Sequence, residues 1–182
     1  MDDFWVFGYA SLMWKPGFDY VEKRRARLYG YHRSLCITSY EHRGTRERPG
    51  LVMGLDRGGS CVGVAFRVAG EKGERVMAYL RERELVTNVY LERSATMALE
   101  KGPKTSAVAY VADRSHGQYA GRLSVEDAVE RVCGAVGGMG PNEDYVINTA
   151  EHIRLLGIRD HWLEHVVAGI RQQMAVTPHQ SG

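Results

Sequence analysis

A glutamate that continues an apolar helical pattern is the first residue that could carry out chemistry. Val76, Leu80 and Glu84 are spaced by four residues, which is typical of one face of a helix. Glu84 should therefore face inward, where burial favours the neutral carboxyl, raises its pKa and makes it a proton acceptor near neutral pH. The alternative interpretation is a drift in helix register, which would leave Glu84 on the rim, paired with Arg81 or Arg83.

The turn after the first expected strand is a second candidate, for ligand binding. The segment 7–12 reads Phe-Gly-Tyr-Ala-Ser-Leu and places small residues where the chain would turn sharply out of a sheet. Backbone N–H groups in such a turn can form an anion-binding nest or hold a developing oxyanion. An ordinary strand end has a similar composition, so this segment alone does not distinguish a structural role from a functional one.

Other residues indicate chemistry less strongly. Glu92 is a second carboxylate candidate, whereas Glu82 should face solvent. The segment His161-Trp162-Leu163-Glu164-His165 matches the metal-binding pattern H-x-x-E-H, and its two histidines could form a ligand pair on one helical face. A catalytic zinc needs a third ligand, so we prefer a solvated or half-buried helix face and expect no metal and no cofactor.

Composition restricts the class of protein. The 182 residues are 44% hydrophobic and 25% charged, values that are typical of globular proteins and argue against intrinsic disorder. The 24 Lys and Arg against 22 Asp and Glu leave a net charge of +2, lower than expected of a protein that binds the nucleic-acid backbone. No apolar run approaches the roughly 18 residues that span a membrane. We therefore expect neither nucleic acid nor membrane as a partner.

The N-terminus and the cysteines indicate the compartment. The first residues lack the basic start and the long apolar stretch of a secretory signal. Cys36, Cys61 and Cys133 are odd in number and far apart, so a disulfide framework or a thiolate zinc site is not expected. Each cysteine should instead pack as a small buried apolar residue. These features favour a reducing, cytoplasmic location.

The elements that must position these residues are mostly strands early in the chain and helices late. Strands are expected near 5–9, 89–99 and 105–112, with one or two more within 26–40. Residues 51–55 and 61–68 should form a β-hairpin around 56–60. One helix should cover 71–84, and three more should begin at the capping residues Ser124, Asn142 and Asp160.

This order of elements predicts an α+β fold with a mixed or antiparallel sheet, because strands and helices do not alternate. The length suits a single domain over residues 1–182, in which residues 175–182 should form a frayed tail.

Four short motifs occur in order, within a resemblance that runs from about residue 5 to 165. They are Val6-Phe7-Gly8-Tyr9-Ala10-Ser11-Leu12-Met13-Trp14, His42-Arg43-Gly44 with Pro49-Gly50, Tyr79-Leu80-Arg81-Glu82-Arg83-Glu84 and Gly140-Pro141-Asn142-Glu143-Asp144-Tyr145. Each motif is short, but their ordered combination resembles the ChaC family of γ-glutamylcyclotransferases.

The resemblance implies a cytosolic enzyme that cleaves glutathione to 5-oxoproline and Cys-Gly, on a compact mixed β-barrel flanked by helices. It also implies that the ligand-binding loop is Val6, Phe7, Gly8, Tyr9, Ala10, Ser11 and Leu12, and that the acid/base carboxylate is Glu84. Arg43 is a candidate for binding a distal carboxylate, and Tyr9 and Tyr145 are candidate hydroxyl donors or pocket walls. The expected partner is a small γ-glutamyl substrate, and the expected state is a monomer or weak dimer.

One position departs from the family pattern. The family usually has glycine where this chain has Ala10, which would be strained if that position required a positive φ, or would narrow the pocket if the ligand approaches the backbone there. Two alternatives therefore stay open. The same chemistry could act on another γ-glutamyl amine or dipeptide, or the chain could be a non-catalytic binding member linked to cation transport.

Overall fold

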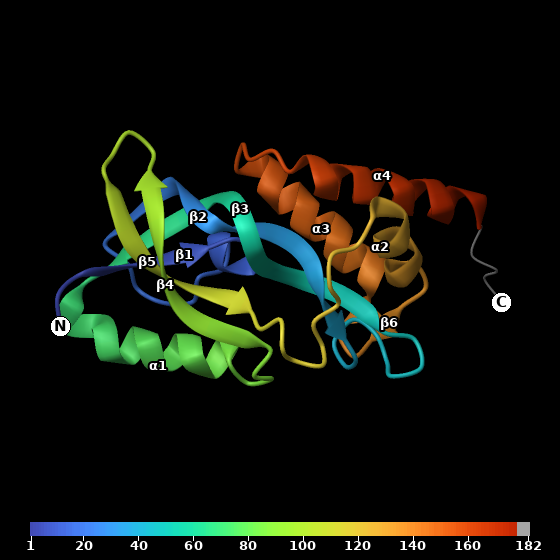
Figure 1. The fold of residues 1–182 in the computed structure, drawn as a ribbon, viewed down its shortest axis with the longest axis horizontal. Helices are drawn as coiled ribbons and strands as arrows, with labels where there is room; N and C mark the ends of the chain where they lie inside the picture. Colours follow the sequence, from blue (N-terminus) through green and yellow to red (C-terminus); the bar gives the residue numbers. More distant parts are fainter. Residues whose placement is uncertain (178–182) are drawn as a thin grey trace. The chain divides into compact units, whose positions relative to one another are not determined.

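The computed structural model describes residues 1–177, which divide into two compact units (Figure 1). The first unit contains Met1–Ser34 and Gly54–Tyr119, and the second contains Leu35–Met53 and the residues from Ala120 onward. The helix α4 continues to Val176, so the expected frayed tail falls mainly on residues outside the described part. The expectation of a single domain over 1–182 stays a prediction.

The first unit is built around a closed β-barrel. The strands are β1 (Phe4–Gly8), β2 (Glu22–Ser39), β3 (Gly50–Val68), β4 (Tyr90–Leu99) and β5 (Lys104–Ala112), in the order β1-β3-β2-β4-β5. The end of β2 from Leu35 and the start of β3 up to Met53 are counted with the second unit. β1 is antiparallel to β3 and parallel to β5, where Val6 pairs with Val108. The barrel and the four α-helices confirm the predicted fold class, a mixed barrel with helices in an α+β chain.

The predicted hairpin at 51–68 is wrong, because β3 runs through the whole segment as one strand. Gly58 and Gly59 adopt positive φ values of 105° and 69°, which lets the strand bend without ending. Asp56 is only 2% exposed, and its carboxylate accepts hydrogen bonds from Arg114 Nε at 2.7 Å and Tyr119 OH at 2.8 Å. The polar residues that indicated a solvent turn therefore lie inside a strand.

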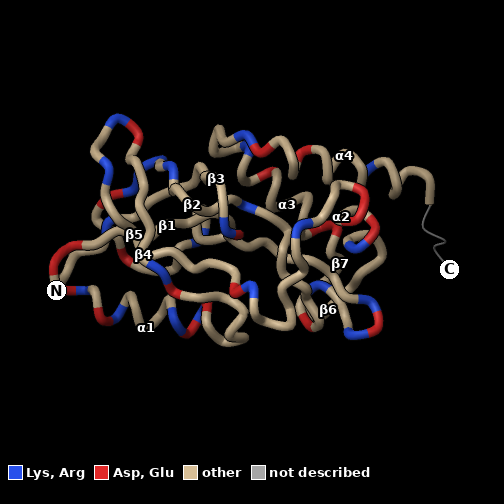
Figure 2. Tube along the Cα trace, in the orientation of Figure 1, with Lys and Arg blue, Asp and Glu red and all other residues tan. Residues whose placement is uncertain are grey.

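The predicted helix at 71–84 is confirmed, although its α-helical part starts two residues later. α1 (Gly73–Glu84) follows a short 3-10 turn, η2 (Gly70–Lys72), and runs along one side of the barrel (Figure 1). Its inner face, which includes Val76 and Leu80, packs in one buried cluster with Val6, Leu12 and Tyr110. Acidic and basic residues follow one another along its length (Figure 2). Burial of this stripe therefore orients the helix and, with it, the residue at its end.

The second unit contains α2 (Val125–Val132), α3 (Asn142–Leu155), α4 (His161–Val176) and a two-stranded sheet of β6 (Val136–Gly137) and β7 (Gly140–Pro141). Figure 1 shows α3 and α4 side by side, and the two helices are in contact. Ser124 and Asp160 cap α2 and α4 as predicted, because their side chains accept the N–H groups of Asp127 and Leu163, each at 3.0 Å.

The predicted capping role of Asn142 is wrong. Asn142 is fully buried, and its side chain accepts the N–H of Leu51 at 2.7 Å and donates to the carbonyl of Leu51 at 2.8 Å. The helix instead begins after Pro141, whose extended backbone provides the N-cap position. The amide at 142 therefore holds the first turn of α3 to β3.

Two sequence expectations concern single residues and membrane spans. Cys36, Cys61 and Cys133 are free and buried, which confirms that they pack as small apolar side chains. Across residues 1–177, every helix is too short or too polar to cross a bilayer.

We expect Asp56→Asn to destabilise the protein by about 1.5–3 kcal/mol, because the neutral amide loses charge-assisted hydrogen bonds. Burial alone would raise the pKa of Asp56, but hydrogen bonds from Arg114, Tyr119 and the N–H of Arg57 lower it below its ordinary value. The stabilisation is therefore present above the unfolded pKa and is lost as pH falls through the folded pKa. Urea unfolding across acidic pH measures both effects.

The matched control is Asp19→Asn, which removes a carboxylate whose side chain is 67% exposed and paired with Lys72. That change should alter stability by no more than about 0.5 kcal/mol. Equal losses in the two variants would contradict the role assigned to Asp56.

Candidate active site

Glu84 lies at the last residue of α1 with its side chain turned inward. The side chain is 16% exposed, and its Oε1 is 3.2 Å from Nε of Arg83. Burial raises the pKa of Glu84 above its ordinary value, and the positive charge of Arg83 partly opposes this rise. The inward orientation predicted from the spacing is confirmed, and the carboxylate nevertheless keeps a contact with one of the two arginines considered for the rim alternative.

Glu92 is held in a different electrostatic state. Its carboxylate accepts two hydrogen bonds from Arg81, at 2.9 and 2.8 Å, and one from Tyr110 OH at 3.0 Å. The hydrogen bond from Arg81 is the main reason why the pKa of Glu92 falls below its ordinary value, although burial opposes it. A carboxylate stabilised in its charged form is a poor proton acceptor, so Glu84 is the better base of the two.

Tyr110 is a residue that the sequence reasoning missed. It is 1% exposed, and burial together with the charge of Glu92 raises its pKa far above the ordinary value. The charge of Glu84 contributes to the same rise, so the two side chains lie within electrostatic range of each other. Tyr110 is therefore a neutral phenol on β5, packed in the same buried cluster as the inner face of α1.

The turn after β1 has the compactness that its small residues predict. A side chain at Gly8 would be crowded, because a Cβ there would lie 3.1 Å from Cβ of Leu12. A 3-10 turn, η1 (Ser11–Met13), follows at once, and Met13 N–H donates to the carbonyl of Ala10 at 2.9 Å. The first N–H groups of such a turn have no partner within it. These amides are the feature that suits a negatively charged or carbonyl ligand.

The predicted binding residues differ in what they can offer a ligand. Of the seven predicted residues at the turn, Ala10 is half-buried and Ser11 is exposed. The other five are buried: Val6, Phe7, Gly8, Tyr9 and Leu12. Ligand contacts at this turn would therefore involve mainly backbone groups and the side chains of Ala10 and Ser11.

Ala10 does not have the positive φ at which an alanine in place of glycine would be strained. Its φ is −138°, outside the left-handed region in which an alanine would be strained. The other option, a methyl group that narrows the binding site, stays a prediction.

Glu84 and the turn are joined by two sets of contacts. Leu12 of the turn and Leu80 of α1 belong to the same buried cluster. The guanidinium of Arg83 donates to Ser11 Oγ at 3.0 Å and to the carbonyl of Lys15 at 2.8 Å. The first unit therefore brings together the predicted acid/base residue and the predicted ligand turn.

Arg43 and Tyr145, the other two predicted binding residues, meet in the second unit. The guanidinium of Arg43 lies 5.3 Å from the centroid of the Tyr145 ring and donates to the carbonyl of Pro141 at 3.3 Å. The hydroxyl of Tyr145 accepts the N–H of Met53 at 3.0 Å. The structure thus places these two residues side by side, and Tyr145 has a structural bond in addition to any role in binding.

The H-x-x-E-H segment forms the first turns of α4. The side chain of His161 is 76% exposed, and Glu164 is bound by Arg159 through two hydrogen bonds at 2.7 and 2.9 Å. Within residues 1–177, His, Cys, Asp and Glu side chains nowhere gather in a group of three suited to a metal ion. The carboxylate of Glu164 is therefore paired with Arg159.

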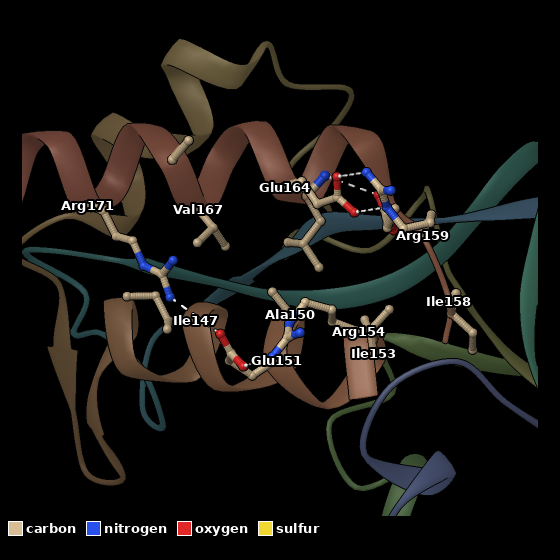
Figure 3. A pocket seen from close by; sticks show the side chains of 13 residues that line it. Ile147, Ala150, Glu151, Ile153, Arg154, Ile158, Arg159, Glu164, Val167 and Arg171 are labelled. Carbon is tan, nitrogen blue, oxygen red and sulfur yellow. Dashed lines mark hydrogen bonds and ion pairs between the residues drawn. The ribbon is translucent and has the colours of Figure 1, made fainter. Parts of the chain in front are cut away.

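A pocket of about 380 Å³ lies between α3 and α4 in the second unit. Its walls are apolar and include Ile153 and Val167, whereas the charged groups at its rim are paired with one another (Figure 3). Glu151, for example, lies between Arg154 at 3.1 Å and Arg171 at 3.5 Å. None of the predicted site residues lines this pocket.

A family model described as ChaC-like protein matches residues 4–173. The chain belongs to the ChaC-like family. It is 30% identical over 171 residues to the glutathione-specific γ-glutamylcyclotransferase of Escherichia coli K12, an alignment that covers 94% of this chain and 74% of that protein. It is 34% identical over 172 residues to glutathione-specific γ-glutamylcyclotransferase 1 of Mus musculus, covering 91% and 77% of the two chains.

A solved structure shares the fold. A γ-glutamyl cyclotransferase specific to glutathione from yeast superposes with a TM-score of 0.85 over 98% of this chain and 100% of that one, at 19% identity. The predicted family and the predicted cyclotransferase-like fold are therefore both confirmed.

The raised pKa of Glu84 has a measurable consequence for stability. Because the folded protein favours the neutral carboxyl, stability is greatest below the unfolded pKa and declines as pH rises through the folded pKa. Glu84→Gln, which cannot ionise, should lack this decline and gain stability relative to the wild type as pH increases. Urea unfolding at acidic and neutral pH measures the difference.

Glu82→Gln is the matched control, because Glu82 lies on the same helix but is exposed. Its stability should follow the wild type at each pH. If Glu84→Gln and the wild type kept a constant stability difference over this range, Glu84 would not be a carboxyl of raised pKa.

Proposed function

We propose that this chain is a γ-glutamylcyclotransferase that cleaves glutathione to 5-oxoproline and Cys-Gly. The observation that carries the proposal is the buried carboxyl of Glu84, with its raised pKa, joined through Arg83 to the turn after β1. The similarity to curated relatives named for this reaction supports the choice of glutathione as substrate.

The proposed reaction needs only groups that the substrate already carries. The α-amino nitrogen of the γ-glutamyl group attacks its own γ-carbonyl carbon, and the new C–N bond closes the five-membered ring of 5-oxoproline. The original amide C–N bond breaks, and Cys-Gly leaves with a free amine. Because attack is intramolecular, correct orientation is worth about 7–11 kcal/mol of the barrier. The proposal includes no cofactor.

Two proton transfers remain for the protein. The substrate amine is mostly an ammonium ion at neutral pH and must lose a proton before it can attack, and the same nitrogen releases a second proton to solvent as the ring amide forms. The leaving nitrogen must then gain one. In the proposal Glu84 first accepts the proton as a base and then donates it as an acid, a function for which a carboxyl of raised pKa is suited.

The proposed binding groups are the backbone amides of the turn and, as separate candidates, Arg43 and Tyr145. Backbone amides between Gly8 and Leu12 bind the γ-glutamyl moiety and polarise its carbonyl. Arg43 stays the candidate for a distal carboxylate, because a guanidinium can donate two parallel hydrogen bonds to a carboxylate. Tyr145 forms a wall beside it.

The proposed location is the cytoplasm, where glutathione keeps thiols reduced. The three free cysteines are consistent with this reducing compartment. We retain a monomer or weak dimer as the proposed state, and a small molecule as the proposed partner.

Glu84→Gln tests the assigned proton transfers, because it keeps the shape of the side chain and removes the base. We expect the rate of 5-oxoproline release from glutathione to fall by about 10²–10⁴-fold, the usual contribution of general acid–base catalysis. The measurement is product formation by purified, folded protein. Glu82→Gln should keep wild-type activity, and near wild-type release by Glu84→Gln would show that Glu84 has another role.

A substrate panel tests the choice of γ-glutamyl compound. Glutathione, a γ-glutamyl dipeptide and a γ-glutamylamine share the reacting group and differ beyond the scissile bond. We expect the highest kcat/KM for glutathione, and we expect Arg43→Met to reduce that preference by raising KM. Preference for a γ-glutamylamine would favour the alternative substrate class, and no 5-oxoproline from any compound would favour a binding protein.

A further inference from the structure

Arg83 makes more contacts around the candidate site than its neighbours on α1. Its side chain is 22% exposed. Its guanidinium touches four groups besides Glu84, all within hydrogen-bond distance: Ser11 Oγ at 3.0 Å, the carbonyl of Lys15 at 2.8 Å, the carbonyl of Pro16 at 3.1 Å and Tyr79 OH at 3.1 Å. One side chain thus connects the last turn of α1 to a segment about 70 positions earlier in the chain.

These contacts hold both ends of η1. Ser11 is its first residue, and the carbonyl of Lys15 lies just after it. On the other side of the turn, Nε of the buried Arg33 donates to the carbonyl of Tyr9 at 2.6 Å. The ligand turn is therefore fixed from β2 by Arg33 and from α1 by Arg83.

The chemistry of the guanidinium suits this task. A planar guanidinium directs several N–H groups along fixed directions, whereas a lysine ammonium is a single point with a flexible stem. Only an arginine can reach Ser11, Lys15 and Glu84 with its Nη2, Nη1 and Nε atoms at the same time.

We propose that Arg83 is a positioning residue that sets the geometry between Glu84 and the turn that binds the γ-glutamyl group. This inference rests on the proposed function and deepens it. Arg83 acts on the substrate through Glu84 and the turn, and its side chain needs no contact with the reacting atoms.

A second effect follows from the charge of Arg83. Among residues 1–177, the groups electrostatically linked to Glu84 are Arg83 on α1 and Tyr110 on β5. Tyr110 in turn donates to Glu92 on β4, which is paired with Arg81. Arg83 lowers the pKa of Glu84, against the effect of burial. Arg83 therefore keeps a larger fraction of Glu84 ionised, and ready to accept a proton, at neutral pH.

Two substitutions separate the effects of position and charge. Arg83→Lys keeps the positive charge but loses the planar set of N–H donors, whereas Arg83→Met loses both the charge and the donors. We expect both variants to lose about ten- to a hundredfold in kcat/KM, because a displacement of the order of 1 Å is enough for such a loss. Only Arg83→Met should shift the acidic limb of the kcat/KM profile to higher pH, since only there does the pKa of Glu84 rise further.

The control is Arg75→Met, which removes a charge from an exposed position on the same helix. Arg75 lies eight residues before Arg83, about 12 Å along the axis at 1.5 Å per residue. Its activity and pH profile should equal those of the wild type. Ser11→Ala removes one of the contacts of Arg83 from the side of the turn and should give a smaller loss than Arg83→Lys.

Hydrogen exchange of the segment 9–16 provides a readout that does not depend on activity. We expect faster exchange there in both Arg83 variants and wild-type exchange in Arg75→Met. If the wild type releases 5-oxoproline while the Arg83 variants keep its kcat/KM, pH profile and exchange, the positioning role is wrong and the proposed function stands. If the wild type releases none, the proposed function fails, and unchanged exchange in the variants would overturn the positioning of the turn as well.

Discussion

The burial of one ionisable carboxyl group is the constraint on which the candidate site depends. Removing a carboxylate from water is costly, so Glu84 could not stay at the end of α1 unless neighbouring groups compensated for its charge or the carboxyl became neutral. Both kinds of compensation contribute in the structure. The pKa of Glu84 is raised, and Nε of Arg83 lies 3.2 Å from Oε1 of Glu84. The balance between these two effects leaves a carboxyl that holds its proton more strongly than an exposed glutamate does, at some cost to the folded state.

The barrel provides the rigidity that this balance requires. The inner face of α1 packs on Val6, Leu12 and Tyr110, which belong to β1, the turn and β5. The parallel pairing of β1 with β5 places the start of the turn beside the strand that carries Tyr110. The inner face of α1, the turn and the phenol therefore pack in one buried cluster, and a shift in any of them would change the surroundings of Glu84.

The sequence predicted the features that depend on local periodicity. The four-residue spacing in α1 identified Glu84 as an inward residue, and the small residues after β1 identified a tight turn. Local signals misread β3, because a run containing Gly58 and Gly59 looks like a turn until its buried carboxylate is seen to bind Arg114. The same limit explains why Arg83 was considered only as a surface partner, since its acceptors lie about 70 residues away.

Arg43 and Tyr145 illustrate a second limit. Their proximity to each other is a fact of the second unit, and no periodic pattern connects positions that are a hundred residues apart. Motif resemblance identified them, but it could not separate a binding role from the bond that Tyr145 makes to Met53. The fold class needed less information, because the order of strands and helices already excluded an alternating arrangement.

The side-chain amide of Asn142 imitates a peptide group. It offers one donor and one acceptor to Leu51, as a neighbouring strand would, and so continues the hydrogen bonding of β3 across to a helix. Aspartate would turn a second oxygen toward the Leu51 carbonyl and repel it, and serine would fall short of both groups. The asparagine of the Gly-Pro-Asn motif thus has a structural role, because it holds α3 to β3. A substitution of Asn142 would therefore impair activity by destabilising the fold, even if Asn142 makes no contact with a ligand.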